Sequence, residues 1–261
     1  MKKITNGLIG VLTLLMMAGV PAEATRGPQG VSYTPHNMST SADTLWSMYV
    51  SDNETQVCVF CHTPHGGSLD GPLWNRENPT TSYTHYNSAS LSTYLQGLAI
   101  NRAVSKESLL CLSCHDGSIA INSLVNYSNT VPNPTHYGGG SISIPITPDG
   151  DPGPKIGASI ENPEAHGDLS DDHPISFAYG SVVAQKATEF KSVDIAEEKG
   201  VRFFGSDDRV ECSSCHDPHV KYDPDYKLFG TDLVSGADIS YKPFLITSNE
   251  GSAMCLACHT K

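Results

Sequence analysis

The apolar residues of this chain predict few regular elements, and all of them are short. Within residues 88–102, four apolar side chains recur at the three- and four-residue spacing of one helix face: Leu91, Tyr94, Leu95 and Leu98. This periodicity predicts a helix. A second helix is expected at 43–50, after the turn-forming Asn37, and a third after Ser105, a candidate N-cap residue. Residues 201–204 are the candidate strand of the second half.

Glycine-rich and proline-rich sequence separates the apolar segments, most of all at residues 126–167. This stretch includes Gly138-Gly139-Gly140 and has only short strand-forming pieces, such as 141–146. The composition predicts a long irregular loop. Because loops of this length are uncommon in compact domains unless they have a task, we expect it to cover a bound group or to meet a partner.

The first 24 residues predict a signal peptide. Lys2 and Lys3 precede an apolar run at 8–20, and Ala22-Glu23-Ala24 is a small-x-small cleavage site. The apolar run is too short to span a bilayer. We therefore expect an exported chain that does not span the membrane, begins near Thr25 when mature, and reaches the cell surface or the extracellular space through the periplasm.

Charge and composition narrow the function further. The chain has 28 Asp and Glu against 16 Lys and Arg, a formal net charge of −12, which argues against nucleic acid or anionic lipid as a partner. Hydrophobic residues make up 38% of it, below the usual value of about 45 to 50% for globular domains. Such a chain lacks the apolar area to offset its own ordering entropy, so a bound apolar group is expected to form much of its core.

The cysteines identify that group. All eight fall into four C-x-x-C pairs, each followed by histidine: Cys58/Cys61/His62, Cys111/Cys114/His115, Cys212/Cys215/His216 and Cys255/Cys258/His259. C-x-x-C-H is the attachment signature of c-type haem, in which the histidine ligates the iron. Zinc sites and disulfides are the alternatives, but neither gives a reason for the histidine that follows every pair. Four haem c groups are therefore the expected cofactors.

The motifs repeat as two related pairs. The octet C-V-F-C-H-T-P-H at 58–65 recurs as C-S-S-C-H-D-P-H at 212–219, and a Cys-Leu-x-Cys-His site follows each, 53 and 43 residues later. This repeat predicts two di-haem modules. The first, with an N-terminal arm, spans 25–125; the second spans 168–261; and the loop at 126–167 joins them.

Seven of the eleven histidines lie outside the four motifs and are candidates for the second axial ligand of each iron. The favoured four are His36, His65, His173 and His219. Pro64 and Pro218 fix turns that aim the histidine after each away from its own haem, so each is expected to bind a different iron. Asp171 and Asp172 can hold the second ring nitrogen of the histidine that follows them, or can instead form a calcium site.

The remaining histidines are His85, His136 and His166, of which the first two are expected at the surface. Axial methionine sulfur is an alternative that the surplus of histidines makes unnecessary. Two histidines per iron leave no open position for a substrate, which favours electron transfer over catalysis and low reduction potentials.

Further motifs give the chain a family resemblance. The octets, the run Pro72-Leu73-Trp74-Asn75, expected to pack on porphyrin, and Asp171-Asp172-His173-Pro174 resemble the multihaem c-type cytochromes of metal-reducing bacteria over nearly the whole mature chain. Four haems in a chain of this size most resemble the tetrahaem outer-membrane cytochrome E type, which polymerises into extracellular filaments. The resemblance implies a multihaem cytochrome c fold of low regular secondary structure, mostly loops with short helices around a stacked haem core.

The family also implies partners. Its haems have two histidine ligands, and a histidine from one subunit can complete a haem in the next; His36 is the position matched to that role. The expected function is a nanowire-like electron carrier, not an enzyme, with itself, other cytochromes and extracellular metal oxides as partners. A soluble periplasmic shuttle is the alternative, and a multihaem reductase or oxidase with one open haem is a third, which the absence of a C-x-x-C-K site disfavours.

Overall fold

A computed structural model describes residues 28–32, 34–42, 49–68, 71–127, 134–136, 156, 167–220 and 244–260. The expected signal peptide at 1–24, the candidate strand piece at 141–146 and His166 lie outside these residues. Regular elements are short: the longest helix, α3, has 10 residues. Among the described residues, no helix has the length and apolar character needed to cross a membrane.

The described helices are α1 (Pro28–Val31), α2 (Thr93–Gly97), α3 (Lys106–His115), α4 (Tyr179–Gln185), α5 (Val193–Glu198), α6 (Cys212–Cys215) and α7 (Ala253–Cys258), with 3-10 turns η1 (Val57–Phe60) and η3 (Glu250–Ser252). Cysteines of the four motifs lie in η1, α3, α6 and α7. The strands form three two-stranded sheets: antiparallel β1 (Tyr49–Ser51) and β3 (Pro134–His136), parallel β2 (Thr84–His85) and β4 (Asp168–Leu169), and antiparallel β5 (Phe177–Ala178) and β6 (Arg209–Val210).

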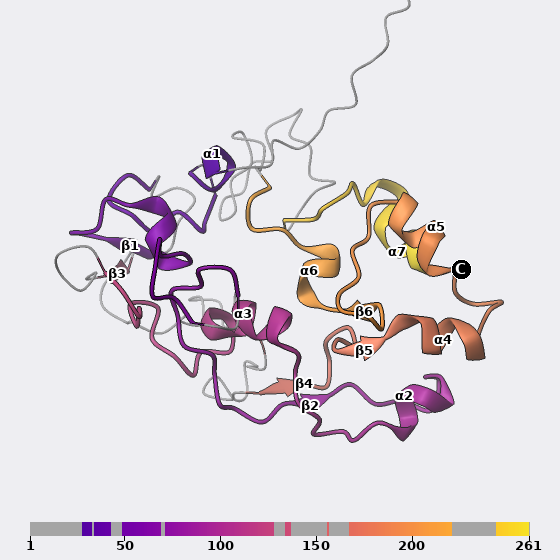
Figure 1. Cartoon of the computed structure of the whole chain (residues 1–261). Coiled ribbons are helices and arrows are strands. Elements are labelled where there is room, and N and C mark those ends of the chain that lie inside the picture. Colours follow the sequence, from indigo (N-terminus) through magenta and orange to yellow (C-terminus); the bar gives the residue numbers. More distant parts are fainter. Residues whose placement is uncertain are drawn as a thin grey trace, which may run out of the picture.

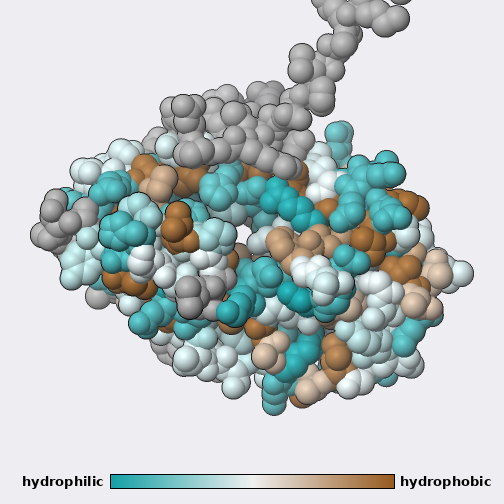
Figure 2. Space-filling model, viewed as in Figure 1, coloured by the Kyte–Doolittle hydropathy of each residue, from teal (hydrophilic) through white to brown (hydrophobic). Residues whose placement is uncertain are grey.

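The described chain forms two halves around a hollow. In Figure 1, α1, β1, β3 and α3 lie in one half and α4 to α7 in the other, and α3 faces α6 where the halves meet. The space-filling view in Figure 2 shows an opening near the centre of the molecule. A further contact joins α2 to α4: Gln185 at the end of α4 accepts a hydrogen bond from the Thr93 hydroxyl of α2 (3.0 Å).

The first octet is closed by a returning segment. His62 forms a β-bridge with Trp74. On either side of this bridge, the Thr63 N–H donates to the Leu73 carbonyl (2.8 Å) and the Asn75 N–H donates to the Cys61 carbonyl (2.9 Å). Leu73 turns the chain with a positive φ of 55°.

The second octet is closed in the same way, by residues that the sequence does not mark as a repeat. His216 bridges to Leu245. The Asp217 N–H donates to the carbonyl of Phe244 (2.8 Å), whose φ is 53°, and the Ile246 N–H donates to the Cys215 carbonyl (2.9 Å). Residues 73–75 and 244–246 are therefore structural counterparts, which extends the duplication inferred from the motifs.

Buried apolar residues form four small clusters in the described part of the chain. Three contain residues from between the cysteines of a motif: Val59 and Phe60 in the first, Ala257 in the second, Leu112 in the third. The fourth packs α4 against β5 and β6. Each cluster has four to six buried members. Cores of this size contribute little stability individually, because small cores bury little area relative to the chain they must order.

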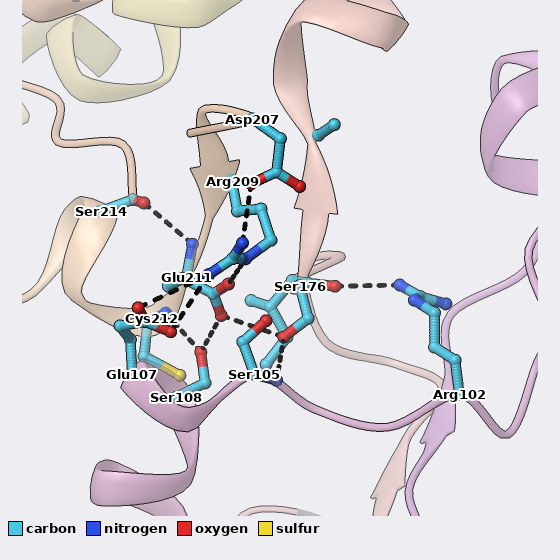
Figure 3. Close-up of polar contacts among 12 residues, drawn as sticks. Arg102, Ser105, Glu107, Ser108, Ser176, Asp207, Arg209, Glu211, Cys212 and Ser214 are labelled. Carbon is cyan, nitrogen blue, oxygen red and sulfur yellow. Dashed lines mark hydrogen bonds and ion pairs between the residues drawn. The ribbon is translucent and has the colours of Figure 1, made fainter. Parts of the chain in front are cut away.

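A buried carboxylate fastens the two halves together (Figure 3). Glu211, whose side chain is 0% exposed, accepts hydrogen bonds from the hydroxyls of Ser108 in α3 (2.6 Å) and Ser176 beside β5 (2.9 Å). Arg209 forms an ion pair with it (3.2 Å). The Ser108 hydroxyl also accepts from the Cys212 N–H (3.0 Å). The helix of the second motif is thereby joined to the helix of the third.

Three sequence predictions of elements need correction. The helix predicted at 88–102 is only Thr93–Gly97, because Ser92 caps it and the chain leaves helical geometry at Leu98. Residues 49–50 of the second expected helix are strand β1, paired with β3, while 43–48 lie outside the described residues. No strand forms at 201–204, where the chain makes one isolated bridge, from Phe204 to Arg209, and the strand is instead β6. Ser105 is the N-cap residue of α3, as predicted, although its side chain makes no capping bond.

Candidate functional site

The four C-x-x-C segments follow one another in space in the order of the sequence. After burial, which has the largest effect, the charge of Cys114 in the second segment raises the pKa of Cys61 in the first. The Cys212 N–H donates to the Ser108 hydroxyl (3.0 Å), one turn before Cys111, and this bond joins the second segment to the third. Thiol charges of the fourth segment raise the pKa of Cys215 in the third, again after burial. The four segments thus form a continuous series.

Each segment buries at least one of the residues between its cysteines, while the cysteines themselves are exposed or half-buried. The buried residues are Val59, Phe60, Leu112, Ser113, Ser214 and Ala257. Cys58 and Cys255 are exposed, the other six cysteines are half-buried, and none of these eight described residues is in a disulfide. Because two residues three apart lie on one face of a helical turn, both thiols of a pair are available to one group bound against that face.

Three motif histidines face a second histidine from a distant part of the chain. The ring centres are 6.0 Å apart for His115 and His36, 6.2 Å for His62 and His219, and 6.5 Å for His259 and His173. In each pair, one member follows a C-x-x-C and the other is one of the four favoured distal candidates. Three of these four candidates are therefore brought to a motif histidine, each to a different one.

The separations fit two imidazoles on opposite sides of one metal ion. A histidine nitrogen lies about 2 Å from the metal it binds, so the ring centres of two opposed ligands lie roughly 6 to 6.5 Å apart. Within the described part of the chain, no group of three or more His, Cys, Asp or Glu side chains is arranged to hold a metal ion. A pair of histidines with two thiols beside it has instead the donors that haem c requires, since the porphyrin supplies the other four nitrogens.

Several of these rings are oriented through their Nδ1 atoms. Nδ1 of His219 lies 3.0 Å from a carboxylate oxygen of Asp217, and Nδ1 of His173 lies 2.9 Å from the Pro174 carbonyl. Nδ1 of His62 lies 3.4 Å from the carbonyl of Pro72. An Nδ1 that donates to such an acceptor leaves Nε2 unprotonated, which is the arrangement found in metal-binding histidines. His173 is thus held by a backbone carbonyl, and not by Asp171 or Asp172 as the sequence suggested.

Asp217 distinguishes the two octets. Its carboxylate accepts from the ring of His219, from the His219 N–H (2.9 Å) and from Arg202 (2.9 Å). The hydrogen bond from the His219 side chain is the largest cause of a lowered Asp217 pKa, with the backbone bond and Arg202 adding to it. The corresponding residue of the first octet is Thr63, whose hydroxyl donates to the His65 carbonyl (3.0 Å) and does not reach the ring.

His36 is held as a neutral ligand-competent imidazole. Burial, followed by the charges of His115 and His219, lowers the pKa of His36 to about 3. Its buried Nδ1 has no hydrogen-bond partner, and neither has the buried Nε1 of Trp74, whose ring packs edge-on against His62. Since buried polar atoms almost always have a partner, these two orphaned donors fit a site that a further polar group, such as a propionate, completes.

The other histidines are placed differently. His65 is exposed, and its ring makes no hydrogen bond or ring contact with the described residues; its carbonyl accepts from Asn126 (3.3 Å). His216 is bridged through its backbone to Leu245. His85 is 1% exposed, with Nε2 3.1 Å from the Arg102 carbonyl, so the expected surface position was wrong. His136 lies in β3, next to β1.

Two residues that organise the first site were missed as functional residues. Asn75 donates through Nδ2 to the carbonyl of Val59, between the first two cysteines, and to that of Asn126 (both 2.6 Å). Arg76 donates to Ser113, between the second two cysteines. Asn75 belongs to a run expected to pack on porphyrin. No pattern in the sequence indicated that Asn75 and Arg76 connect the first two motifs through hydrogen bonds to residues between their cysteines.

The Asp217 contact predicts a pH-dependent loss of stability in Asp217→Asn. Its hydrogen bonds are charge-assisted, so the variant should lose about 1.5 to 3 kcal/mol of unfolding free energy at neutral pH. Because the folded state holds the pKa of Asp217 below its ordinary value of 3.8, this stabilisation is complete above that value and is lost as the pH falls through the lowered pKa. The difference from wild type should therefore shrink in acid.

Denaturant unfolding of the purified protein near pH 7 and near pH 3 measures this effect. Asp207→Asn is the matched control, since Asp207 also pairs with an arginine but its side chain is 50% exposed, and it should cost at most about 1 kcal/mol. Equal stabilities for Asp217→Asn and Asp207→Asn at neutral pH would contradict the role given to Asp217.

Comparison of the chain with models of known protein families and with curated proteins gives no match. A function can therefore be assigned only from the motifs and from the geometry of the residues around them.

Proposed function

We propose that this protein is an exported tetrahaem c-type cytochrome that conducts electrons through closely spaced haems and catalyses no reaction of its own. The observation that carries the proposal is the set of three histidine pairs, each joining a C-x-x-C-H histidine to a distant histidine at 6.0 to 6.5 Å. Zinc knuckles and disulfides give no reason for such pairs, whereas an iron held between two imidazoles requires them.

In this proposal each C-x-x-C pair holds one haem through two thioether bonds. When bound, each haem supplies an iron that accepts and releases one electron. The chain positions the series: Ser108 of α3 donates to Glu211 and accepts from the Cys212 N–H of α6, so neighbouring attachment sites are in contact. Short distances between successive cofactors are what electron transfer along a protein requires.

The histidine pairs favour electron transfer over substrate chemistry. In this proposal His62 and His219 would hold the first iron, His115 and His36 the second, and His259 and His173 the fourth. An iron with two histidines has no position at which a substrate can bind, and its potential is lower than that of an iron with a methionine ligand. The reductase or oxidase alternative needs such an open position.

We assign His65 as the second ligand of the third iron, whose first ligand would be His216. His219 follows the third motif and faces the first, so the duplication places its counterpart His65 opposite the third. His65 is exposed and is free to ligate within its own chain or in a neighbouring one. His36, matched by resemblance to the role between subunits, lies instead against His115 of the same chain, so His65 becomes the better candidate for that role.

Polymerisation into an extracellular filament, with metal oxides or other cytochromes as electron acceptors, is the form of this function that the family resemblance favours. A periplasmic shuttle would use the same ligands and differ only in assembly. Electron microscopy of the secreted protein separates them, since we expect fibres, and uniform small particles would remove the filament from the proposal.

Electron paramagnetic resonance of the oxidised, purified protein tests the coordination. We expect four low-spin signals per chain, because all irons have two imidazole ligands. A high-spin, five-coordinate haem in the wild-type protein would contradict the proposal and favour an enzyme.

A further inference from the structure

Arg76 is a buried cation placed between the first and second motifs. Its side chain, 0% exposed, donates from NH2 to the carbonyls of Ser113 (2.9 Å) and Ala120 (3.0 Å), and from NH1 to the carbonyl of Ile121 (2.6 Å). Nε lies 3.3 Å from the Ser113 hydroxyl. All four acceptors are neutral, so the hydrogen bonds are satisfied while the charge is not balanced.

No carboxylate among the described residues forms an ion pair with this guanidinium. The two buried acids of the same half bond elsewhere: Glu54 accepts from the Gln56 N–H (2.8 Å), and Asp116 accepts from the Tyr83 hydroxyl (2.7 Å). Burying a charge without a counterion is costly, and proteins retain such a charge rarely. Its retention here points to a use.

Arg76 also lies beside the first attachment site. The N–H of the preceding residue, Asn75, donates to the Cys61 carbonyl (2.9 Å), and the Asn75 side chain donates to the carbonyl of Val59, between Cys58 and Cys61 (2.6 Å). The chain therefore holds Arg76 next to the cysteines that, under the proposed function, carry the first haem.

The duplicated site supplies an internal comparison. Residues 73–75 and 244–246 close the two octets with the same backbone contacts, so the position after them, Arg76, corresponds to Thr247. The third motif has its own arginine nearby, Arg202, but it is paired with Asp217 at 2.9 Å. The two structurally equivalent sites therefore differ by one unbalanced, buried positive charge.

We propose that Arg76 sets the reduction potential of the haem attached at Cys58 and Cys61 above that of its duplicate at Cys212 and Cys215. This inference rests on the proposed function. Reduction of ferric to ferrous iron adds one electron and breaks no bond, so the site gains one negative charge. A fixed cation in a low-dielectric interior stabilises that added charge. Electrons shared between these two haems would then settle preferentially at the first.

Arg76→Gln in the full, haem-loaded protein tests this, with potentials measured by a mediated electrochemical titration followed by absorption. The electrode supplies the electrons. We expect one of the four reduction steps, that of the first haem, to move to a more negative potential. Lys186→Gln is the matched control: it removes a positive charge from the end of α4, where the ion pair with Glu189 is solvent-accessible, and should leave every step in place.

A second variant keeps the arginine and balances its charge. Ser113→Asp replaces the hydroxyl that Nε of Arg76 contacts with a carboxylate, and the same shift of the reduction potential to a more negative value is expected. If Arg76→Gln does not retain four haems, Ser113→Asp decides the question alone. Unchanged potentials in a four-haem Ser113→Asp protein would overturn the inference, whereas a wild-type protein without haem would overturn the proposed function instead.

Discussion

His219→Ala should convert one of the four haems, about a quarter of the total, from low-spin to high-spin. The affected haem is expected to be the one attached at Cys58 and Cys61, since the His219 ring is stacked on that of His62 at 6.2 Å. It is not the haem of the third motif, which immediately precedes His219 in the sequence. Loss of the imidazole leaves that iron with His62 alone, and electron paramagnetic resonance of the oxidised protein measures the change directly.

The duplication provides the matched control, His65→Ala. This variant should also produce one high-spin haem, but at the third motif. The two are told apart by combining each with His62→Met, because only an iron that keeps His219 can then show methionine–histidine ligation. A His219→Ala protein with four low-spin haems would contradict the ligand assignment.

Removal of all eight attachment cysteines by Cys→Ser should abolish cooperative folding. The described chain buries its apolar residues in four small clusters, three of them built on residues between the motif cysteines. Without haem these clusters face no apolar group, and the remaining area does not offset the ordering entropy of about 1 to 2 kcal/mol per residue. Near-ultraviolet circular dichroism and the dispersion of amide-proton chemical shifts in NMR spectra should show a chain without fixed tertiary structure.

The control replaces one pair, Cys255→Ser with Cys258→Ser, and removes only the fourth haem. This protein should keep the fold of its first half, because the cluster around Met38 and Phe60 does not involve α7. A compact, cooperatively unfolding protein after the eightfold replacement would show that the polypeptide has a sufficient core of its own.

The sequence predicted the proximal residues of each site and a set of distal candidates, but it did not predict which histidine would lie opposite which. C-x-x-C-H is a local pattern, so its spacing alone defines two thiols and a histidine on one side of a helical turn. Pairing is set by contacts between residues up to 157 positions apart, as for His62 and His219, and no periodicity encodes these. The proline in each octet predicted only that the second histidine turns away from its own motif, and the contact of His219 with His62 agrees with this for the second octet.

The difference between the octets shows a second limit. Thr63 and Asp217 occupy equivalent positions in the motif, yet only Asp217 reaches the ring of the following histidine. Similarly, Arg76 and Thr247 become comparable only once the returning segments are seen to match. Low apolar content predicted small cores, whereas the element boundaries failed wherever long-range pairing competed with helical spacing, as at 49–50.

The central claim is that each C-x-x-C-H motif carries one covalently bound haem. Mass spectrometry of the intact, exported protein under denaturing conditions, which release metal ions and non-covalent ligands, measures this directly. The account predicts a single species heavier than the polypeptide by four haem groups. Each variant with a cysteine pair replaced by serine should carry one haem group fewer than the wild-type protein. The mass of the bare polypeptide, or a mass lowered only by the hydrogens lost in disulfide formation, would contradict it.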